Sequence, residues 1–140
     1  NYSFNYFINT SFINSKYTSS DVPGVKGKKV EFVPKTNIKS GFKFGYKNLM
    51  FNIQYSYLSS QFTDASNAIS GNLSGVIGQI PSYDILDFSS SYVINKFKLE
   101  FGINNMLNNY YFTRRATGYP GPGIIPSEPR SIYITVQIKI

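Results

Sequence analysis

The sequence predicts an all-β fold: an antiparallel transmembrane β-barrel to which this chain contributes about six strands in meander order. Two observations predict it. Apolar and polar residues alternate with a period of two in six segments, and the connections between those segments are either very short or long. The segments run to roughly 8 to 12 residues, whereas soluble strands most often have about 5 or 6. A tilted strand of about 10 residues covers the apolar band of an outer membrane.

Each of the six segments has one apolar and one polar face. They lie at 2–13, 37–46, 49–57, 86–94, 97–104 and 132–140. The last is the most regular, with Ile132, Ile134, Val136, Ile138 and Ile140 opposite Tyr133, Thr135, Gln137 and Lys139. In the first segment Phe7 and Ile13 break the alternation. No apolar run reaches the roughly 18 residues of a membrane helix.

The connections are either short turns or long loops, and this difference indicates that the two ends of a barrel are built differently. Turns of about two residues are expected at Lys47-Asn48 and at Asn95-Lys96. Long loops are expected at 17–35, 60–82 and 113–129, all rich in Gly, Pro, Ser, Asn and Thr. Outer-membrane barrels have their short turns on the periplasmic side. Six strands leave open edges that hydrocarbon does not tolerate, so further strands must close the barrel.

Composition excludes several kinds of chemistry. The sequence contains no Cys and no His, so disulfides, thiolate or imidazole metal sites and nucleophile–His pairs are all ruled out. We therefore predict no enzyme, no cofactor and no metal site. The net charge of +7 and the cluster Lys26, Lys28 and Lys29 raise the question of nucleic acid. The charge is scattered and no nucleic-acid motif accompanies it, so we predict no such partner.

The second half of the chain resembles the closing strands of TonB-dependent receptors, especially the ferric-dicitrate type. The resemblance is carried in order by Tyr83-x-x-x-Asp87, Gly102-x-x-Asn105-x-Leu107-x-x-Tyr110, Gly118-Tyr119-Pro120-Gly121-Pro122-Gly123 and Arg130. Val33-Pro34 and Phe62-Thr63-Asp64-x-x-Asn67 also look like that family's barrel, so the likeness covers nearly the whole chain. The end departs from it, because such barrels usually finish in an aromatic residue and this chain finishes in Ile140.

The resemblance implies a location, a function and partners. We expect residues 1–140 to be the C-terminal part of a 22-stranded barrel in the bacterial outer membrane, in contact with lipid. The chain opens at Asn1 inside an alternating pattern, so the plug domain and the earlier strands are expected outside it. The family imports iron chelates or similar nutrients, and it contacts the TonB complex through the plug region.

Three residues are candidates for facing the ligand. Arg114 and Arg115 open the last long loop, where guanidinium groups can bind carboxylates of an anionic chelate. Alternatively they pair with acidic loop residues or lipid phosphates. Tyr119 could stack on a ligand, although a role as a packing anchor for its loop is favoured. Arg130 is expected to order the end of that loop.

Other polar residues have structural interpretations. Lys98, Glu100 and Lys139 are expected to form ion pairs on the polar face. Asp84 and Asp87 are three apart on a strand, so they cannot form a general acid–base couple. Asp64 and Asn67 supply too few oxygens for a calcium site. Asn104-Asn105 is expected to form a bulge before the strand continues. Aromatic girdles are expected at the strand ends, from Tyr2, Phe4, Tyr46, Tyr57, Phe97 and Tyr110.

A soluble alternative remains open at this point. A β-sandwich or small barrel acting as a binding module would bury the apolar faces of these strands against each other. The two interpretations differ in where Ile134, Val136 and Ile138 lie. They are exposed on one face of a single sheet in the barrel wall, and enclosed in a core in the soluble module.

Overall fold

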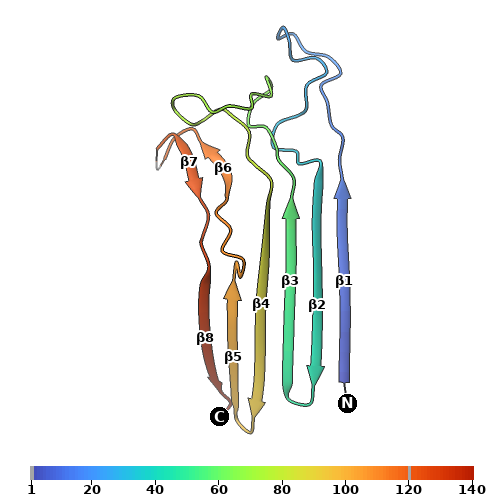
Figure 1. The fold of residues 1–140 in the computed structure, drawn as a ribbon, viewed down its shortest axis with the longest axis vertical. Helices are drawn as coiled ribbons and strands as arrows, with labels where there is room; N and C mark the ends of the chain where they lie inside the picture. Colours follow the sequence, from blue (N-terminus) through green and yellow to red (C-terminus); the bar gives the residue numbers. More distant parts are fainter. Residues whose placement is uncertain (1, 120) are drawn as a thin grey trace.

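A computed structural model of the chain describes residues 2–119 and 121–140, so Asn1 and Pro120 of the Gly/Pro-rich motif lie outside the described residues. The described strands are β1 (Tyr2–Phe12), β2 (Thr36–Tyr46), β3 (Leu49–Leu58), β4 (Tyr83–Ile94), β5 (Phe97–Asn104), β6 (Phe112–Ala116), β7 (Gly123–Pro126) and β8 (Ser131–Ile138) (Figure 1). Six of them form one sheet in the order β1-β2-β3-β4-β5-β8, and β6 pairs with β7. Within these residues, no helix has the length and apolar character needed to cross a membrane.

The six predicted strands are confirmed, and they pair as an antiparallel meander. The largest difference is in β4, which begins at Tyr83 rather than Leu86. Both predicted tight turns are present, and Lys47 and Asn95 each adopt a φ of 51°. Two-residue hairpin turns require such left-handed residues. These turns, the start of β1 and the end of β8 lie at one end of the sheet, and the long connections lie at the other (Figure 1).

The strand register carries the two faces across the whole sheet. On one face Phe4 pairs with Phe44, which pairs with Phe51. Aromatic rings of neighbouring strands also pack diagonally on this face. The ring centroids of Phe4 and Phe42 are 4.7 Å apart. On the other face the polar rung runs through Asn5, Lys43, Asn52 and Ser89. Successive residues of a strand point to opposite sides, so the sheet has one apolar and one polar face.

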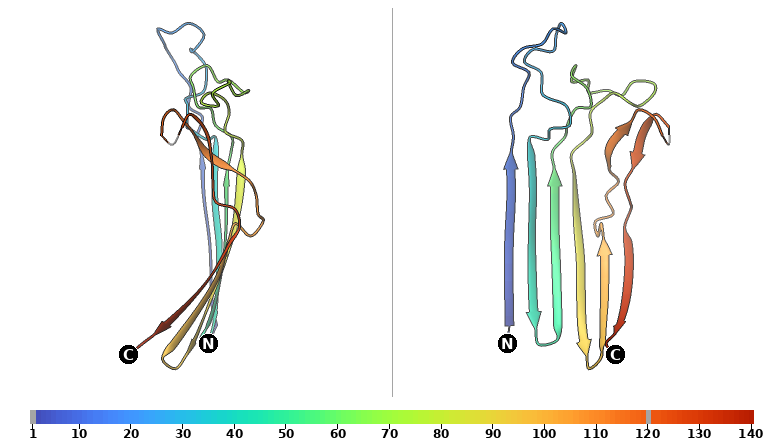
Figure 2. Two further views of the ribbon diagram at one scale, coloured as in Figure 1. Left: turned by 90° about the vertical axis from the view of Figure 1, so that its left-hand side faces the viewer. Right: turned by 180° about the vertical axis from the view of Figure 1, so that it is seen from behind.

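The sheet is a single layer without a core. Seen along its edge, no second layer covers the six strands (Figure 2). Ile134 is 74% exposed, Val136 57% and Ile138 61%, and the buried apolar residues among those described, Val25, Ile80 and Ala116, all lie outside this sheet. A sandwich or small soluble barrel would enclose these side chains. The soluble alternative is therefore wrong for the described chain.

Two aromatic side chains on the polar face lie over glycines of the neighbouring strand. Phe7 pairs with Gly41, and a Cβ at Gly41 would overlap the Phe7 ring. Tyr133 pairs with Gly102, where a Cβ would overlap the tyrosine ring. The missing side chain thus leaves room for the ring, which explains how Phe7 interrupts the alternation without disturbing the strand.

The third long connection differs from the prediction of an irregular loop. It contains the hairpin of β6 and β7, in which Ala116 pairs with Gly123 and the register shifts between Phe112 and Arg115. The predicted bulge at Asn104-Asn105 is also wrong. Strand β5 ends at Asn104, and Asn105 turns the chain away with a φ of 49°.

Candidate functional site

The three long connections meet at one end of the sheet, where they form the first candidate region. The first and second are joined through Lys29 and Asn67. The Lys29 N–H donates to Asn67 Oδ1 at 2.7 Å, and Asn67 Nδ2 donates back to the Lys29 carbonyl at 2.8 Å. A backbone bond from the Phe32 N–H to the Phe62 carbonyl, at 2.9 Å, runs alongside. These bonds hold the two connections together.

Arg115 joins the second connection to the third. Its Nη1 donates to the Gly75 carbonyl at 2.8 Å and its Nη2 to the Gln79 carbonyl at 3.1 Å. The guanidinium carbon lies 5.2 Å from the centroid of the Phe112 ring, a cation–π distance. The partners of Arg115 are therefore carbonyls rather than the acidic loop residues considered from the sequence. A ligand contact by Arg115 stays a prediction.

The other two ligand-facing candidates are exposed. Arg114 is exposed on β6, and adjacent residues of a strand project to opposite sides. Tyr119 is 97% exposed, so the interpretation as a packing anchor is wrong within the part of the chain that the structure describes. A ligand contact by either residue stays a prediction.

The junction after β5 is built by asparagines, whose role was missed from the sequence. Asn105 is only 3% exposed. Its N–H donates to Asp87 Oδ1 at 2.9 Å, its Nδ2 to the Asn109 carbonyl at 2.9 Å, and its Oδ1 accepts the Asn109 N–H at 3.0 Å. Asn109 Nδ2 in turn donates to the carbonyl and carboxylate of Asp84, at 3.0 and 3.2 Å. Asp84 and Asp87 thus each accept hydrogen bonds from asparagines of this junction, and they do not form an acid–base couple.

The end of the third connection is tied to the same junction. The Arg130 N–H donates to Asn108 Oδ1 at 3.2 Å, and this backbone bond ties the loop end to the junction. A role of the Arg130 side chain in ordering the loop stays a prediction. Asn108 itself has a φ of 56°. Asparagine tolerates this left-handed region better than most residues. The two Asn-Asn pairs, Asn104-Asn105 and Asn108-Asn109, were the sequence feature from which this junction could have been predicted.

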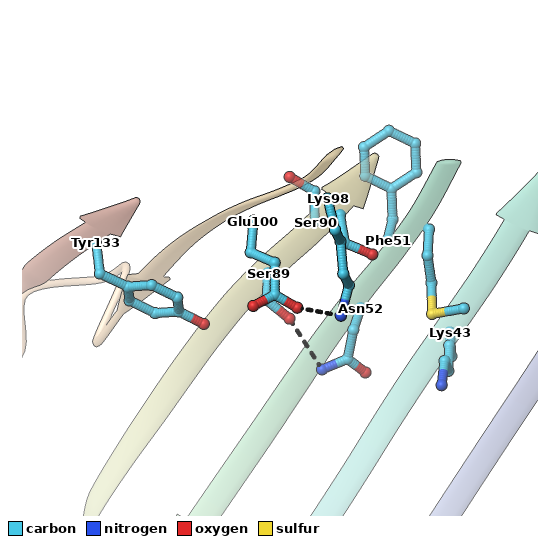
Figure 3. Close-up of a pocket in the computed structure, with 10 residues that line it drawn as sticks. Lys43, Phe51, Asn52, Ser89, Ser90, Lys98, Glu100 and Tyr133 are labelled. Carbon is cyan, nitrogen blue, oxygen red and sulfur yellow. Dashed lines mark hydrogen bonds and ion pairs between the residues drawn. The ribbon is translucent and has the colours of Figure 1, made fainter. Parts of the chain in front are cut away.

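A second candidate region is a hollow of about 350 Å³ on the polar face. Figure 3 shows Lys43, Asn52, Glu100 and Tyr133 projecting toward it from four strands. Lys98 Nζ lies 2.5 Å from Glu100 Oε1, which confirms that part of the predicted ion-pair ladder. In the part of the chain that the structure describes, Lys139 joins no salt bridge, so its place in the ladder is not supported.

The first long connection has an internal link of its own. Tyr17 Oη donates to Glu31 Oε2 at 2.5 Å. The bond to this carboxylate raises the pKa of Tyr17, because losing the phenolic proton would break it.

No group of three potential metal ligands exists within the described ranges 2–119 and 121–140. Asp64 Oδ1 instead accepts the Ser66 N–H at 2.9 Å.

Aromatic side chains lie at both ends of the sheet, where girdles were predicted. Tyr2 and Tyr46 stack with centroids 4.7 Å apart beside the tight turns. Phe97 follows a turn and is 48% exposed. At the opposite end Tyr110 is 89% exposed, and Tyr57 lies one residue before the end of β3. Phe4 is the third residue of β1, so a girdle position for it stays a prediction.

Comparisons with known proteins agree with this architecture. The chain is similar to the ferric citrate transporter FecA in its unliganded form, with 24% identity over 96% of this chain and 21% of that one and a TM-score of 0.85. It is also similar to the ferric yersiniabactin uptake receptor FyuA from Yersinia pestis, with 18% identity over 96% and 21% of the two chains and a TM-score of 0.76. The siderophore receptor PiuA from Acinetobacter baumannii matches with 21% identity over 96% and 19% and a TM-score of 0.76.

The chain thus spans about a fifth of the length of these structures. A sequence model of the family described as TonB dependent receptor-like, beta-barrel, matches residues 1–106. This match covers more than half of the chain. The chain belongs to the family of TonB-dependent receptor-like β-barrels.

Proposed function

We propose that the complete protein is a TonB-dependent receptor of the bacterial outer membrane that imports an iron chelate. Residues 1–140 are the C-terminal part of its barrel and supply six strands of wall, three external loops and the closing strand. The plug and the earlier strands belong to the same polypeptide, and the TonB complex acts on the plug region. The protein is a transporter and not an enzyme.

The apolar face of the six-stranded sheet is the observation that carries this proposal. Large side chains such as Phe4, 64% exposed, and Ile132, 63% exposed, cover it. Water in contact with such a face is unfavourable by about 25 cal/mol per Å² of apolar surface. Hydrocarbon removes this penalty, and a sheet can meet hydrocarbon only if its backbone groups are all paired.

Pairing of every backbone group requires more strands. The outer edges of β1 and β8 have no neighbour in the described sheet. A closed barrel of this class needs at least about eight strands. We infer that the remainder of a 22-stranded wall lies between these two edges. The similar structures support this, since the chain covers only about a fifth of each.

The polar face and the loops support transport of a polar chelate. Amide, hydroxyl and lysine side chains line the hollow on this face. FecA, FyuA and PiuA are described as receptors or transporters of ferric citrate, ferric yersiniabactin and siderophores. An iron chelate is therefore the substrate class proposed for this protein as well.

The test is iron uptake by cells that carry or lack the full-length gene. ⁵⁵Fe would be supplied as its citrate, a catecholate and a hydroxamate chelate, and outer-membrane fractions would be probed for the protein. We expect the protein in the outer membrane and loss of uptake of at least one chelate in the deletion strain, restored by the gene only when TonB is present. Unchanged uptake of all three, or a soluble protein, would contradict the proposal.

A further inference from the structure

The first long connection begins as a two-stranded arm, residues 13–30, that rises beyond the end of the sheet (Figure 1). Past the end of β1, the backbones of Ile13, Ser15 and Tyr17 each bond the returning chain. These positions alternate as in a strand, so the residues between them project to the other side of the chain. Lys16 therefore lies on the side of Phe12, the last residue of β1 and part of the apolar face.

Two lysines face each other across this arm. Lys16 lies directly opposite Lys29, and both side chains are exposed. Backbone bonds flank the two residues on either side, which makes them a non-hydrogen-bonded pair. In such a pair the Cα atoms are about 4.5 Å apart and the side chains come closest. Like charges directly opposite each other destabilise antiparallel strands, so this lysine pair favours an anion between its ammonium groups.

Neither lysine of the pair has a carboxylate partner in the described chain. The one salt bridge found within residues 2–119 and 121–140 joins Lys98 to Glu100. Glu31, close to the arm, instead accepts the Tyr17 hydroxyl at 2.5 Å. Asp21, the acidic residue of the arm itself, is exposed and takes no part in that salt bridge. The charge of the lysine pair is therefore available to an anion from outside the chain.

The arm is held in place by contacts of its own. The side chain of Asn67 bonds both backbone groups of Lys29, its N–H at 2.7 Å and its carbonyl at 2.8 Å. Near the tip, Gly24 and Gly27 adopt φ values of 81° and 83°, and Val25 is only 7% exposed. An anion that binds the lysine pair therefore does not have to order the backbone beneath it, which lowers the entropic cost of binding.

The lysine pair lies just beyond the apolar face of the wall. Phe12 is 72% exposed on that face. Four residues of extended chain, from Phe12 to Lys16, span about 13 Å. In a barrel whose apolar face meets lipid, this height corresponds to the headgroups of the outer leaflet, which are phosphorylated sugars in a bacterial outer membrane.

We propose that Lys16 and Lys29 form a docking surface for the phosphate groups of lipopolysaccharide, the glycolipid of the outer leaflet. The two ammonium groups donate charge-assisted hydrogen bonds to phosphate oxygens and lose their mutual repulsion when the phosphate binds. The position of the pair beside lipid rests on the proposed function. Its close spacing and its free charge do not.

Lysine labelling in bilayers tests this docking surface. The full-length receptor would be inserted into phosphatidylethanolamine bilayers that contain either lipopolysaccharide or the same glycolipid stripped of its phosphates. An amine-reactive ester would then acylate it, and mass spectrometry would follow each lysine. We expect the phosphorylated glycolipid to slow modification of Lys16 and Lys29 several-fold. Equal rates in the two bilayers would overturn the proposal.

Lys28 is the matched control within the same arm. It is exposed, but it neighbours Lys29 in the chain and so projects to the other side. We expect its labelling rate to be the same in both bilayers. Slowing of Lys28 equal to that of Lys16 and Lys29 would show a general attraction of the arm to anionic lipid, which contradicts a defined pair.

Substitutions measure how much the pair contributes to binding. In Lys16→Gln with Lys29→Gln, we expect the detergent-solubilised full-length receptor to bind lipopolysaccharide about thirtyfold more weakly, about fivefold for each charge lost. Lys16→Arg with Lys29→Arg should keep the Kd within about threefold, because it preserves the charge. Lys28→Gln should match the wild type. A Gln pair with the Kd of the wild type, by native mass spectrometry, would refute the docking surface.

Inorganic phosphate separates a lipid site from a general anion site. In bilayers with the stripped glycolipid, millimolar phosphate should leave labelling of Lys16 and Lys29 unchanged, and slowing equal to that by lipopolysaccharide would overturn the assignment to the lipid. A receptor that inserts into neither bilayer contradicts the proposed function as well as the docking surface. An inserted receptor with equal labelling rates contradicts the docking surface alone.

Discussion

Arg115 shows how one side chain can define a loop assembly. Its guanidinium spans carbonyls of Gly75 and Gln79, which lie in a different connection from β6. A Cβ at Gly75 would come within 3.1 Å of the Gly123 backbone, so the two connections approach each other closely here. Two charge-assisted bonds and a close backbone contact make the second connection and the β6–β7 hairpin one unit.

The first prediction is that Arg115→Gln separates this unit. Glutamine is too short to span both carbonyls, and the loss of charged hydrogen bonds costs about 1–3 kcal/mol. Amide hydrogen exchange in residues 72–79 and 112–126 of the full-length receptor should become roughly tenfold faster. Arg114→Gln is the control, since Arg114 is exposed, and it should leave exchange unchanged. Equal exchange in the two variants would refute the role given to Arg115.

Sequence reasoning at the residue scale found candidates but not their partners. Arg114 and Arg115 stood out because they open the last long loop, where guanidinium groups can bind the carboxylates of a chelate. The neighbouring sequence did not distinguish the two arginines, because the carbonyls that bind Arg115 lie 40 and 36 residues away along the chain. Tyr119 was assigned a packing role from its Gly/Pro-rich surroundings, yet it is 97% exposed. Such contacts depend on how distant loops fold over each other, which a periodic pattern does not encode.

At the scale of a single element, the junction after β5 determines how the chain leaves the sheet. Asn105 combines a left-handed backbone with three hydrogen bonds to Asp87 and Asn109. Its side chain bonds the backbone of its own turn, which favours this geometry over continued strand. Strand β5 therefore stops at Asn104, and the chain is free to form β6 away from the sheet.

The second prediction concerns this junction. Asn105→Ala removes three side-chain bonds, two with the Asn109 backbone and one of 3.4 Å to the Glu128 carbonyl, and strains the left-handed backbone, so the free energy of unfolding should fall by about 2–4 kcal/mol. Urea unfolding of the full-length receptor in bilayers measures this. Asn104→Ala is the comparison, because Asn104 makes one exposed bond, to Ser131 Oγ at 3.1 Å. A loss no greater than that of Asn104→Ala would mean that the junction is not stabilised by Asn105.

The sequence predicted strands correctly where apolar and polar residues alternate over many residues, and it predicted loops where this alternation is absent. The six strands of the large sheet span 8 to 12 residues, enough to establish a period of two. Strands β6 and β7 have 5 and 4 residues, and a register shift interrupts their pairing. A pattern of that length is not distinguishable from a loop, so the hairpin was missed.

The whole molecule is a wall with two different surfaces. The same division continues from β1 to β8, with Phe7 and Tyr133 as aromatic exceptions on the polar face, because one register runs through five strand pairs. Under the proposed function, lipid on one side explains the exposed Ile, Phe and Tyr side chains, and water on the other side explains the amide, hydroxyl and lysine side chains. In the proposed barrel, further strands pair with the edges of β1 and β8, and such a wall needs no core of its own.

The most direct test is to measure which face meets lipid. The segment has no Cys, so an introduced cysteine is its single labelling site. With any cysteine outside the segment replaced, spin labels would be placed in the full-length receptor in bilayers at Ile53→Cys and Ile134→Cys, and at their neighbours Asn52→Cys and Thr135→Cys. The account predicts strong collision with oxygen dissolved in the lipid at positions 53 and 134, and weak collision at 52 and 135. Labels at 53 and 134 that meet only an aqueous nickel reagent, or neither reagent, would contradict it.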